Sequence, residues 1–297
     1  MQHNTFYKNL TFNKLIIIDC LPDDEYQTAR RLCENLTDSG LGCGVTLIKT
    51  QNEEEFRSII QTIKDSFKPE LELSFLPIIH IEAHGSPLSM ELPDKSTISW
   101  QELADELRSI NKLMNNQLIS FIGTCHGYHF IHNNHTIKNF TPVYFCIAPL
   151  DEISAGDIES ATNTFYLNLF STGNLSTSAN LLSPSKIYTY NADYMFHRAF
   201  YEAMQKNHKG KTLKTRKEEL IAEAIQQLGK TWDDMNSKDK KLFLKKARNL
   251  LNVSLKSKES LRIIFDRFST AYMGYADGDV FEEIWLHMQQ NKQGSLY

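Results

Sequence analysis

The chain lacks any apolar run long enough to cross a membrane. None of its stretches approaches the roughly 20 consecutive apolar residues that a transmembrane helix needs. Residues 1–10 also contain no long apolar region of the kind found in signal peptides. The sequence therefore predicts a cytoplasmic protein that has no membrane partner.

Cysteine is scarce, and the few cysteines follow neither a disulfide pattern nor a metal-binding pattern. The five are scattered at Cys20, Cys33, Cys43, Cys125 and Cys146. Disulfide frameworks of small secreted domains use even numbers of cysteines at regular spacings, so this odd number indicates a reducing compartment. We expect neither a metal nor a cofactor.

The composition is otherwise that of an ordinary globular protein, with 41% hydrophobic and 23% charged residues. From residue 14 onward, apolar runs typical of buried strands alternate with amphipathic segments typical of helices. The predicted strands are Lys14–Cys20, Gly44–Lys49, Leu76–Gly85, the run that begins at Leu118, and Pro142–Ala148. The predicted helices are Asp23–Asn35, Asn52–Phe67, Ser99–Met114 and about Ser154–Phe170. Because the strands are too far apart for hairpins, we expect a mainly parallel sheet with helices on both faces.

Two of the predicted strands end at a chemically reactive side chain. The first, Leu76–Gly85, ends in Ala-His-Gly with a histidine at position 84, and the second ends in Gly-Thr-Cys-His-Gly with a cysteine at position 125. Parallel α/β sheets present catalytic groups at the carboxyl ends of their strands. Taken singly, such a cysteine is more often a small buried residue and such a histidine a surface residue. Their paired placement favours a cysteine nucleophile with an acid–base partner.

The order of these motifs resembles that of the caspase-like cysteine peptidases, most of all the CHAT branch, which is related to caspases and separase. The resemblance covers residues 14 to about 205. The matching motifs are His84-Gly85, Ser99-Trp100-Gln101-Glu102-Leu103, Gly123-Thr124-Cys125-His126-Gly127, Ala148-Pro149-Leu150-Asp151-Glu152 and Phe165-Tyr166. The chain departs from the family pattern at Thr124, where alanine is frequent. The resemblance implies a three-layer α/β caspase-like fold.

The resemblance also implies a role for each residue of the predicted site. Cys125 would be the nucleophile, and His84 would protonate the departing amine. The backbone N–H groups of Cys125 and Gly85 would hold the oxyanion, since a residue without a side chain lets the backbone approach a substrate carbonyl closely. No third residue that would orient His84 is evident, and caspase-like enzymes do not depend on one.

Two acidic residues are candidates for the substrate-binding pocket. The family places an acidic residue near the position of Asp151, where a carboxylate would favour Arg or Lys before the scissile bond. Asp151 also suits the start of a helix, where the helix dipole stabilises negative charge, and both interpretations stay open. Asp157 is the weaker candidate because it falls inside a predicted helix.

Histidines recur at every third position after the cysteine, at His126, His129, His132 and His135. Zinc ligands on a helix usually lie four residues apart, whereas a three-residue repeat drifts around the helix. Several asparagines nearby favour a polar surface loop at the rim of the site over a metal centre.

The chain beyond about residue 205 differs in charge from the rest. Residues 206–259 contain 15 Lys and Arg against 7 Asp and Glu, a net charge of +8, whereas the whole chain carries −4. This asymmetry suggests an acidic partner or nucleic acid, although the solvated faces of amphipathic helices explain it more simply. We predict a peptidase domain over residues 1–205. A helical C-terminal extension follows over residues 206–297, with helices around Leu220–Leu228, Lys240–Leu251 and twice within Ser260–Gln289.

The sequence thus predicts a cysteine endopeptidase that acts on protein substrates. Prokaryotic members of the resembled family often serve in defence or programmed cell death and stay inactive until a sensor engages, which implies a separate activator protein. One alternative is a non-catalytic interaction module with the same fold, against which the presence of both His84 and Cys125 argues. The other is a nucleic-acid-binding protein centred on residues 206–259, which a salt-dependent gel shift would detect.

Overall fold

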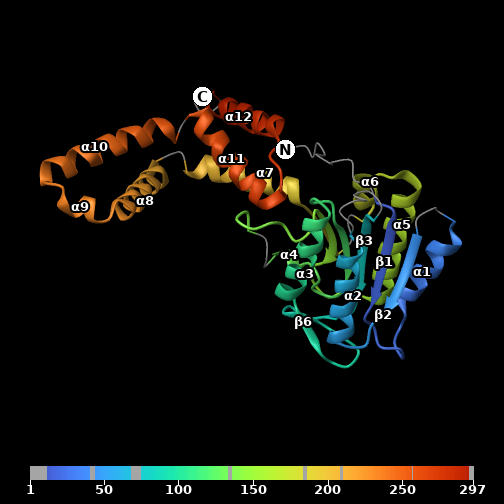
Figure 1. The fold of residues 1–297 in the computed structure, drawn as a ribbon. Helices are drawn as coiled ribbons and strands as arrows, with labels where there is room; N and C mark the ends of the chain where they lie inside the picture. Colours follow the sequence, from blue (N-terminus) through green and yellow to red (C-terminus); the bar gives the residue numbers. More distant parts are fainter. Residues whose placement is uncertain are drawn as a thin grey trace. The chain divides into compact units, whose positions relative to one another are not determined.

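The computed structural model describes residues 12–40, 44–67, 75–132, 136–182, 186–207, 210–255 and 257–293. The chain divides into two compact units, which Figure 1 draws as ribbons. The first unit runs to Tyr194 and includes Tyr272–Gly274, and the second contains Met195–Ala271 and the residues from Tyr275 onward. The change of composition at residue 205 falls inside the helix α7 (Ala192–Asn207).

A six-stranded sheet in the order β2-β1-β3-β7-β8-β9 forms the centre of the first unit. Its strands are β1 (Lys14–Asp19), β2 (Gly44–Lys49), β3 (Pro77–Glu82), β7 (Ile119–Gly123), β8 (Phe145–Pro149) and β9 (Ile187–Asn191). Every pairing is parallel except that of β8 with β9. The four central strands are buried almost throughout, as expected of parallel strands with both faces covered. The predicted mainly parallel sheet is confirmed.

Helices cover the sheet in two layers. Helix α1 (Thr28–Asp38) packs with α5 (Ala155–Thr172), and helix α2 (Glu53–Asp65) packs with α3 (Trp100–Leu113). The chain moves from β1 to β2 in one direction and from β2 across β1 to β3 in the other. Right-handed crossovers therefore place α1 and α2 on opposite faces. The direction of winding reverses between β1 and β3, which is where open α/β sheets form a crevice at their carboxyl edge.

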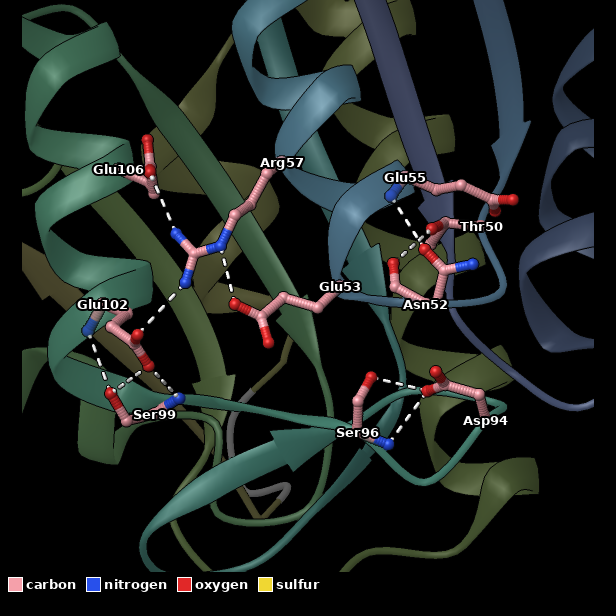
Figure 2. Close-up of polar contacts among 10 residues, drawn as sticks. All are labelled: Thr50, Asn52, Glu53, Glu55, Arg57, Asp94, Ser96, Ser99, Glu102 and Glu106. Atoms are coloured by element: carbon pink, nitrogen blue, oxygen red, sulfur yellow. Dashed lines mark hydrogen bonds and ion pairs between the residues drawn. The ribbon is translucent and has the colours of Figure 1, made fainter.

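An arginine joins the two helices of the second layer. Arg57 of α2 contacts Glu53 of its own helix at 2.8 Å, and Glu102 and Glu106 of α3 at 3.1 and 3.6 Å (Figure 2). These are partly exposed pairs, so we expect them to orient α3 more than to stabilise the fold.

Both of these helices begin with side-chain caps that the sequence indicated. The Asn52 side chain accepts the backbone N–H of Glu55 at 2.9 Å, and Ser99 and Glu102 form a capping box at the start of α3 (Figure 2). Hydrogen bonds from Ser99 hold the pKa of Glu102 below its usual range. The predicted helices Asn52–Phe67 and Ser99–Met114 are confirmed to within two residues at each end.

Two local expectations were wrong. Helix α1 begins at Thr28 rather than at Asp23, and residues 20–27 form a loop that we call the β1–α1 loop. The strand predicted over Leu76–Gly85 ends at Glu82, and the chain after it forms a small antiparallel sheet of β4 (His84–Gly85), β5 (Ser89–Glu91) and β6 (Thr97–Ser99). Strands of two or three residues are too short to leave a periodic pattern in the sequence.

The remaining helices of the first unit are short, namely α4 (His129–His132) and α6 (Leu175–Asn180). The second unit is helical, as expected, with α8 (Gly210–Leu228), α9 (Lys230–Asp234), α10 (Ser237–Ser254), α11 (Lys258–Met273) and α12 (Gly278–Gln293). Phe265 is the centre of its core, with the rings of Phe196, Phe200 and Phe281 at centroid distances of 5.1 to 5.5 Å. No helix in the described part of the chain is long and apolar enough to cross a membrane.

Candidate active site

Cys125 stands in a tight turn two residues beyond the end of β7. His126 in this turn has φ of 58°, a left-handed conformation that non-glycine residues rarely adopt. The N–H of His126 donates to the carbonyl of Asp151 at 3.2 Å, and the N–H of Tyr128 donates to the carbonyl of Pro149 at 2.8 Å. The end of β8 and the loop after it therefore hold the turn in its strained conformation.

The thiol of Cys125 is half-buried against the same loop. Its Sγ accepts the N–H of Ile153 at 3.5 Å and lies 3.6 Å from the carbonyl oxygen of Ile153, to which the S–H can donate. The backbone N–H of Cys125 makes no hydrogen bond to the described residues. The main-chain groups of Ile153 thus hold the sulfur in place, whereas the N–H of Cys125 stays available to a ligand.

His84 lies on the small sheet rather than at the tip of β3. Trp100, the first residue of α3, is buried, and its indole N–H donates to the carbonyl of Ser86 at 2.9 Å. Its backbone N–H donates to the carbonyl of Leu88 at 3.2 Å. The Ser-Trp start of α3 therefore fixes the hairpin that carries the histidine, a use of Trp100 that the sequence did not indicate.

The two predicted catalytic loops meet at the carboxyl edge of the sheet. The ladder between β3 and β7 ends at the pair Glu82 and Gly123, and both His84 and Cys125 stand two residues beyond that pair. Gly85 lies against the backbone of the cysteine turn. A Cβ built at Gly85 would overlap the carbonyl oxygen of Cys125 and approach its carbonyl carbon to 3.1 Å. Only glycine permits this approach.

The direction of the Gly85 N–H follows from the pairing of β4 with β5. Antiparallel pairs alternate between hydrogen-bonded and non-hydrogen-bonded positions. The N–H of Ser86 donates to Ser89 at 2.9 Å, so the next pair, Gly85 with Met90, is of the non-bonded kind. The N–H of Gly85 therefore points away from β5. The sequence suggested Gly85 because a glycine lets the backbone approach a substrate carbonyl closely. In the structure, Gly85 also lies close to the carbonyl of Cys125.

A third side chain does contact the histidine, contrary to expectation. The Nε2 of His84 lies 2.6 Å from Oε2 of Glu25, in the β1–α1 loop. Glu25 falls in the first turn of the helix predicted over Asp23–Asn35, where an acidic residue needs no further explanation. Pro22 just before the acidic run also suits a helix start, so nothing in the local sequence indicated the loop.

The two acidic candidates for substrate binding lie in different settings. Asp151 is exposed in the loop after β8, and its backbone carbonyl holds the cysteine turn. Asp157 is exposed in the first turn of α5, where its carboxylate accepts the hydroxyl of Ser154 at 2.8 Å and its N–H donates to the same hydroxyl at 3.1 Å. Asp157 is thus part of a helix cap, whereas Asp151 is exposed to solvent beside the cysteine turn.

Three of the repeated histidines form a short row. Residues 129–132 make a helical turn where a loop was expected, and the rings of His126, His129 and His132 follow one another at centroid distances of 5.7 and 6.4 Å. His135 lies outside the described residues. Among the residues that are described, no three His, Cys, Asp or Glu side chains are grouped to hold a metal ion.

Two of the other described cysteines are more deeply buried than Cys125. Cys20 and Cys146 have no exposed surface, and burial raises the pKa of both thiols above the usual range. Such thiols are poor nucleophiles at neutral pH. Cys33 is half-buried on α1, and Cys43 lies outside the described residues.

A buried polar cluster lies behind the site, on the strand that leads to it. His80 and Glu82 of β3 are almost completely buried, and their side chains pair at 2.8 Å. His80 also bonds the Tyr166 hydroxyl at 3.2 Å, and Glu82 accepts the hydroxyl of Thr28 at the start of α1. A Cβ on Gly123 would lie 3.1 Å from the Glu82 side chain. The cluster ties α1, β3 and α5 together directly below the candidate site.

The chain was compared with protein families and with curated proteins. No family model matches the chain, and no curated protein matches it at a significant level.

Proposed function

We propose that this protein is a cysteine endopeptidase of the caspase-like kind, similar to the CHAT branch, which cleaves protein substrates with Cys125 and His84. The close approach of Gly85 to the Cys125 carbonyl supports this most, because it brings the histidine loop and the cysteine turn together. The site lies at the carboxyl edge of a sheet whose winding reverses nearby, which is the usual position of active sites in such sheets.

The proposed reaction begins when His84 takes the proton of the Cys125 thiol. The thiolate attacks the carbonyl carbon of the scissile peptide bond, and the N–H groups of Cys125 and Gly85 stabilise the oxyanion that forms. The carbon–nitrogen bond then breaks as His84 returns the proton to the departing amine. Water, deprotonated by His84, finally hydrolyses the thioester and frees the thiol.

Two features of the substrate and its control are part of the proposal. Asp151 would favour a basic residue before the cut, but as an exposed carboxylate its contribution would be smaller than that of a buried charge. A separate sensor or activator protein would release activity, in a role in defence or programmed cell death that the family resemblance alone suggests.

The dyad can be tested by comparing the wild-type protein with Cys125→Ala and His84→Ala on a peptide library and on co-expressed candidate partner proteins. We expect both variants to lose at least about 1,000-fold in kcat/KM while their melting temperatures stay unchanged. Cys33→Ala, which removes a half-buried thiol elsewhere, is the matched control and should cleave normally. Undiminished cleavage by purified Cys125→Ala would overturn the assignment.

A second candidate function is nucleic-acid binding by the helical unit. The exposed lysines of α10 favour it, because Lys241, Lys245 and Lys246 take part in no ion pair with the described residues. A gel shift whose affinity falls steeply between low and physiological salt would support this candidate.

A further inference from the structure

We propose that Glu25 is a positioning residue of the active site, which orients His84 and stabilises its charged form while the Cys125 thiol is deprotonated. This deepens the proposed peptidase function and rests on it. The carrying observation is the 2.6 Å contact between His84 Nε2 and Glu25 Oε2, which joins the loops after β1 and β3.

The contact determines which nitrogen of His84 can act on the thiol. A carboxylate has no proton to donate at neutral pH, so Nε2 of His84 carries the hydrogen and donates it to Glu25. The free lone pair is then on Nδ1, which is the atom left to take the proton of Cys125. A hydrogen bond to one ring nitrogen commonly fixes the tautomer and orientation of a catalytic histidine in this way.

The backbone of Glu25 is held on both sides. Its N–H donates to the carbonyl of Pro22 at 3.3 Å, and its own carbonyl accepts the side-chain amide of Gln27 at 3.0 Å. The same amide also donates to Pro22 at 2.6 Å, which closes the loop on itself. The carboxylate is therefore presented from a defined turn rather than from a free loop.

The two ends of the β1–α1 loop are attached to the sheet and to α5. Lys49 of β2 donates to the carbonyl of Leu21 at 2.5 Å and pairs with the buried Asp19 at 3.2 Å. On the other side, the hydroxyl of Tyr26 donates to Glu159 of α5 at 2.6 Å. Both ends of the loop are therefore held by neighbouring elements, which keeps Glu25 beside His84.

A merely structural role for the pair makes a different prediction. The side chains of His84 and Glu25 are 48% and 40% exposed, and ion pairs with this exposure contribute little to folding. If the pair only joined two loops, removing its charge would change neither thiol reactivity nor melting temperature. If Glu25 positions His84, reactivity falls and the melting temperature stays the same.

The reactivity of Cys125 can be measured without a known substrate, from the rate at which iodoacetamide alkylates it at neutral pH. Mass spectrometry of the Cys125 peptide follows the reaction, and the buried Cys20 and Cys146 serve as internal references that stay unlabelled in folded protein. We expect Glu25→Gln and Glu25→Ala to slow alkylation about tenfold or more, because a carboxylate that orients a reactive histidine fixes its tautomer. Glu25→Asp should recover part of the rate.

The matched control is Asp24→Asn, which removes one negative charge from the neighbouring position of the same loop and should react like the wild type. With a cleavable peptide, the Glu25 variants should lose kcat and keep KM. An unchanged alkylation rate in Glu25→Gln, an equal loss in Asp24→Asn, or a lowered melting temperature in Glu25→Gln would each overturn the inference. If His84→Ala also leaves alkylation unchanged, the dyad itself fails. If His84→Ala slows it and Glu25→Gln does not, only the role of Glu25 fails.

Discussion

The central sheet of the first unit and the α9–α10 segment of the second unit are stabilised in opposite ways. Strands β3, β7 and β8 have every residue buried, whereas α9 and α10 contain no buried residue. Leu242, Leu250 and Val253 of α10 are each at least half exposed. The sheet depends on tertiary packing, which can hold catalytic groups in place. Helix α10 depends on its Asn236 cap and on pairs with α8 such as that of Arg248 with Glu218, which leave much of its surface free for contacts.

The largest expected effect is the difference in stability lost when one phenylalanine in each region is replaced by alanine. Phe121 is fully buried at the centre of β7, where its ring packs on His80 at a centroid distance of 5.1 Å, whereas Phe243 of α10 is half-buried against Trp232 at 5.5 Å. We expect Phe121→Ala to lower the free energy of unfolding by about 3–5 kcal/mol and Phe243→Ala by about 1 kcal/mol. Urea unfolding followed by circular dichroism measures both. Equal losses would contradict the contrast.

The second largest difference between the two regions should be in the hydrogen exchange of their backbone amides. Backbone amides open with free energies that rise with the packing around them. We expect the amides of β3 and β7 to exchange hydrogen at least about 100-fold more slowly than those of α10. Hydrogen-exchange mass spectrometry on the intact chain is the measurement. Comparable protection in α10 would mean that its exposed apolar surface is covered in solution.

Charge reversal on α10 tests whether the exposed surface of this helix binds a partner. Lys240 lies over the ring of Trp232 at 5.5 Å and stabilises the segment, so it is left intact. Replacing Lys241, Lys245 and Lys246 by Glu should change the free energy of unfolding by less than about 0.5 kcal/mol, as expected of exposed positions. We expect activity that depends on a partner to fall and hydrolysis of a small peptide to be spared. The same three positions changed to Arg are the control, and loss in both assays would make α10 structural.

The smallest effect is expected at Thr124, the residue before Cys125. Thr124 is buried, and its hydroxyl has no hydrogen-bond partner among the described residues, where the resembled family often has alanine. Burying an unsatisfied hydroxyl costs free energy, so Thr124→Ala should leave stability unchanged or raise it by up to about 1 kcal/mol. Thermal unfolding and the alkylation rate of Cys125 check this together. A clear loss of stability would show that the hydroxyl has a partner.

The elements that the sequence predicted correctly are those marked by apolar runs or helix caps within a few residues. The strands β1 and β2 and the capped starts at Asn52 and Ser99 were confirmed because apolar runs and caps act over a few residues. Helix α1 was misplaced because the acidic residues after Pro22 look like a helix start, while bonds from Lys49 to the loop hold them outside the helix. The antiparallel direction of β9 also left no trace in the sequence.

The candidate site was predicted in part for the same reason. His84 and Cys125 could be found because each follows an apolar run, and their roles stay predictions. Glu25 could not be found, because its contact with His84 joins positions 59 residues apart and depends on the order of the strands. The support that Trp100 gives to the hairpin is likewise a product of tertiary structure.

The turn that holds Cys125 has a consequence for the order of biosynthesis. The carbonyls of Pro149 and Asp151 accept the hydrogen bonds that keep His126 in its left-handed conformation. A nascent chain that ends before Pro149 therefore contains Glu25, His84 and Cys125 but lacks both acceptors that fix the turn. Cys125 is synthesised before the residues that position it, so a ribosome-bound fragment of that length carries an unpositioned thiol.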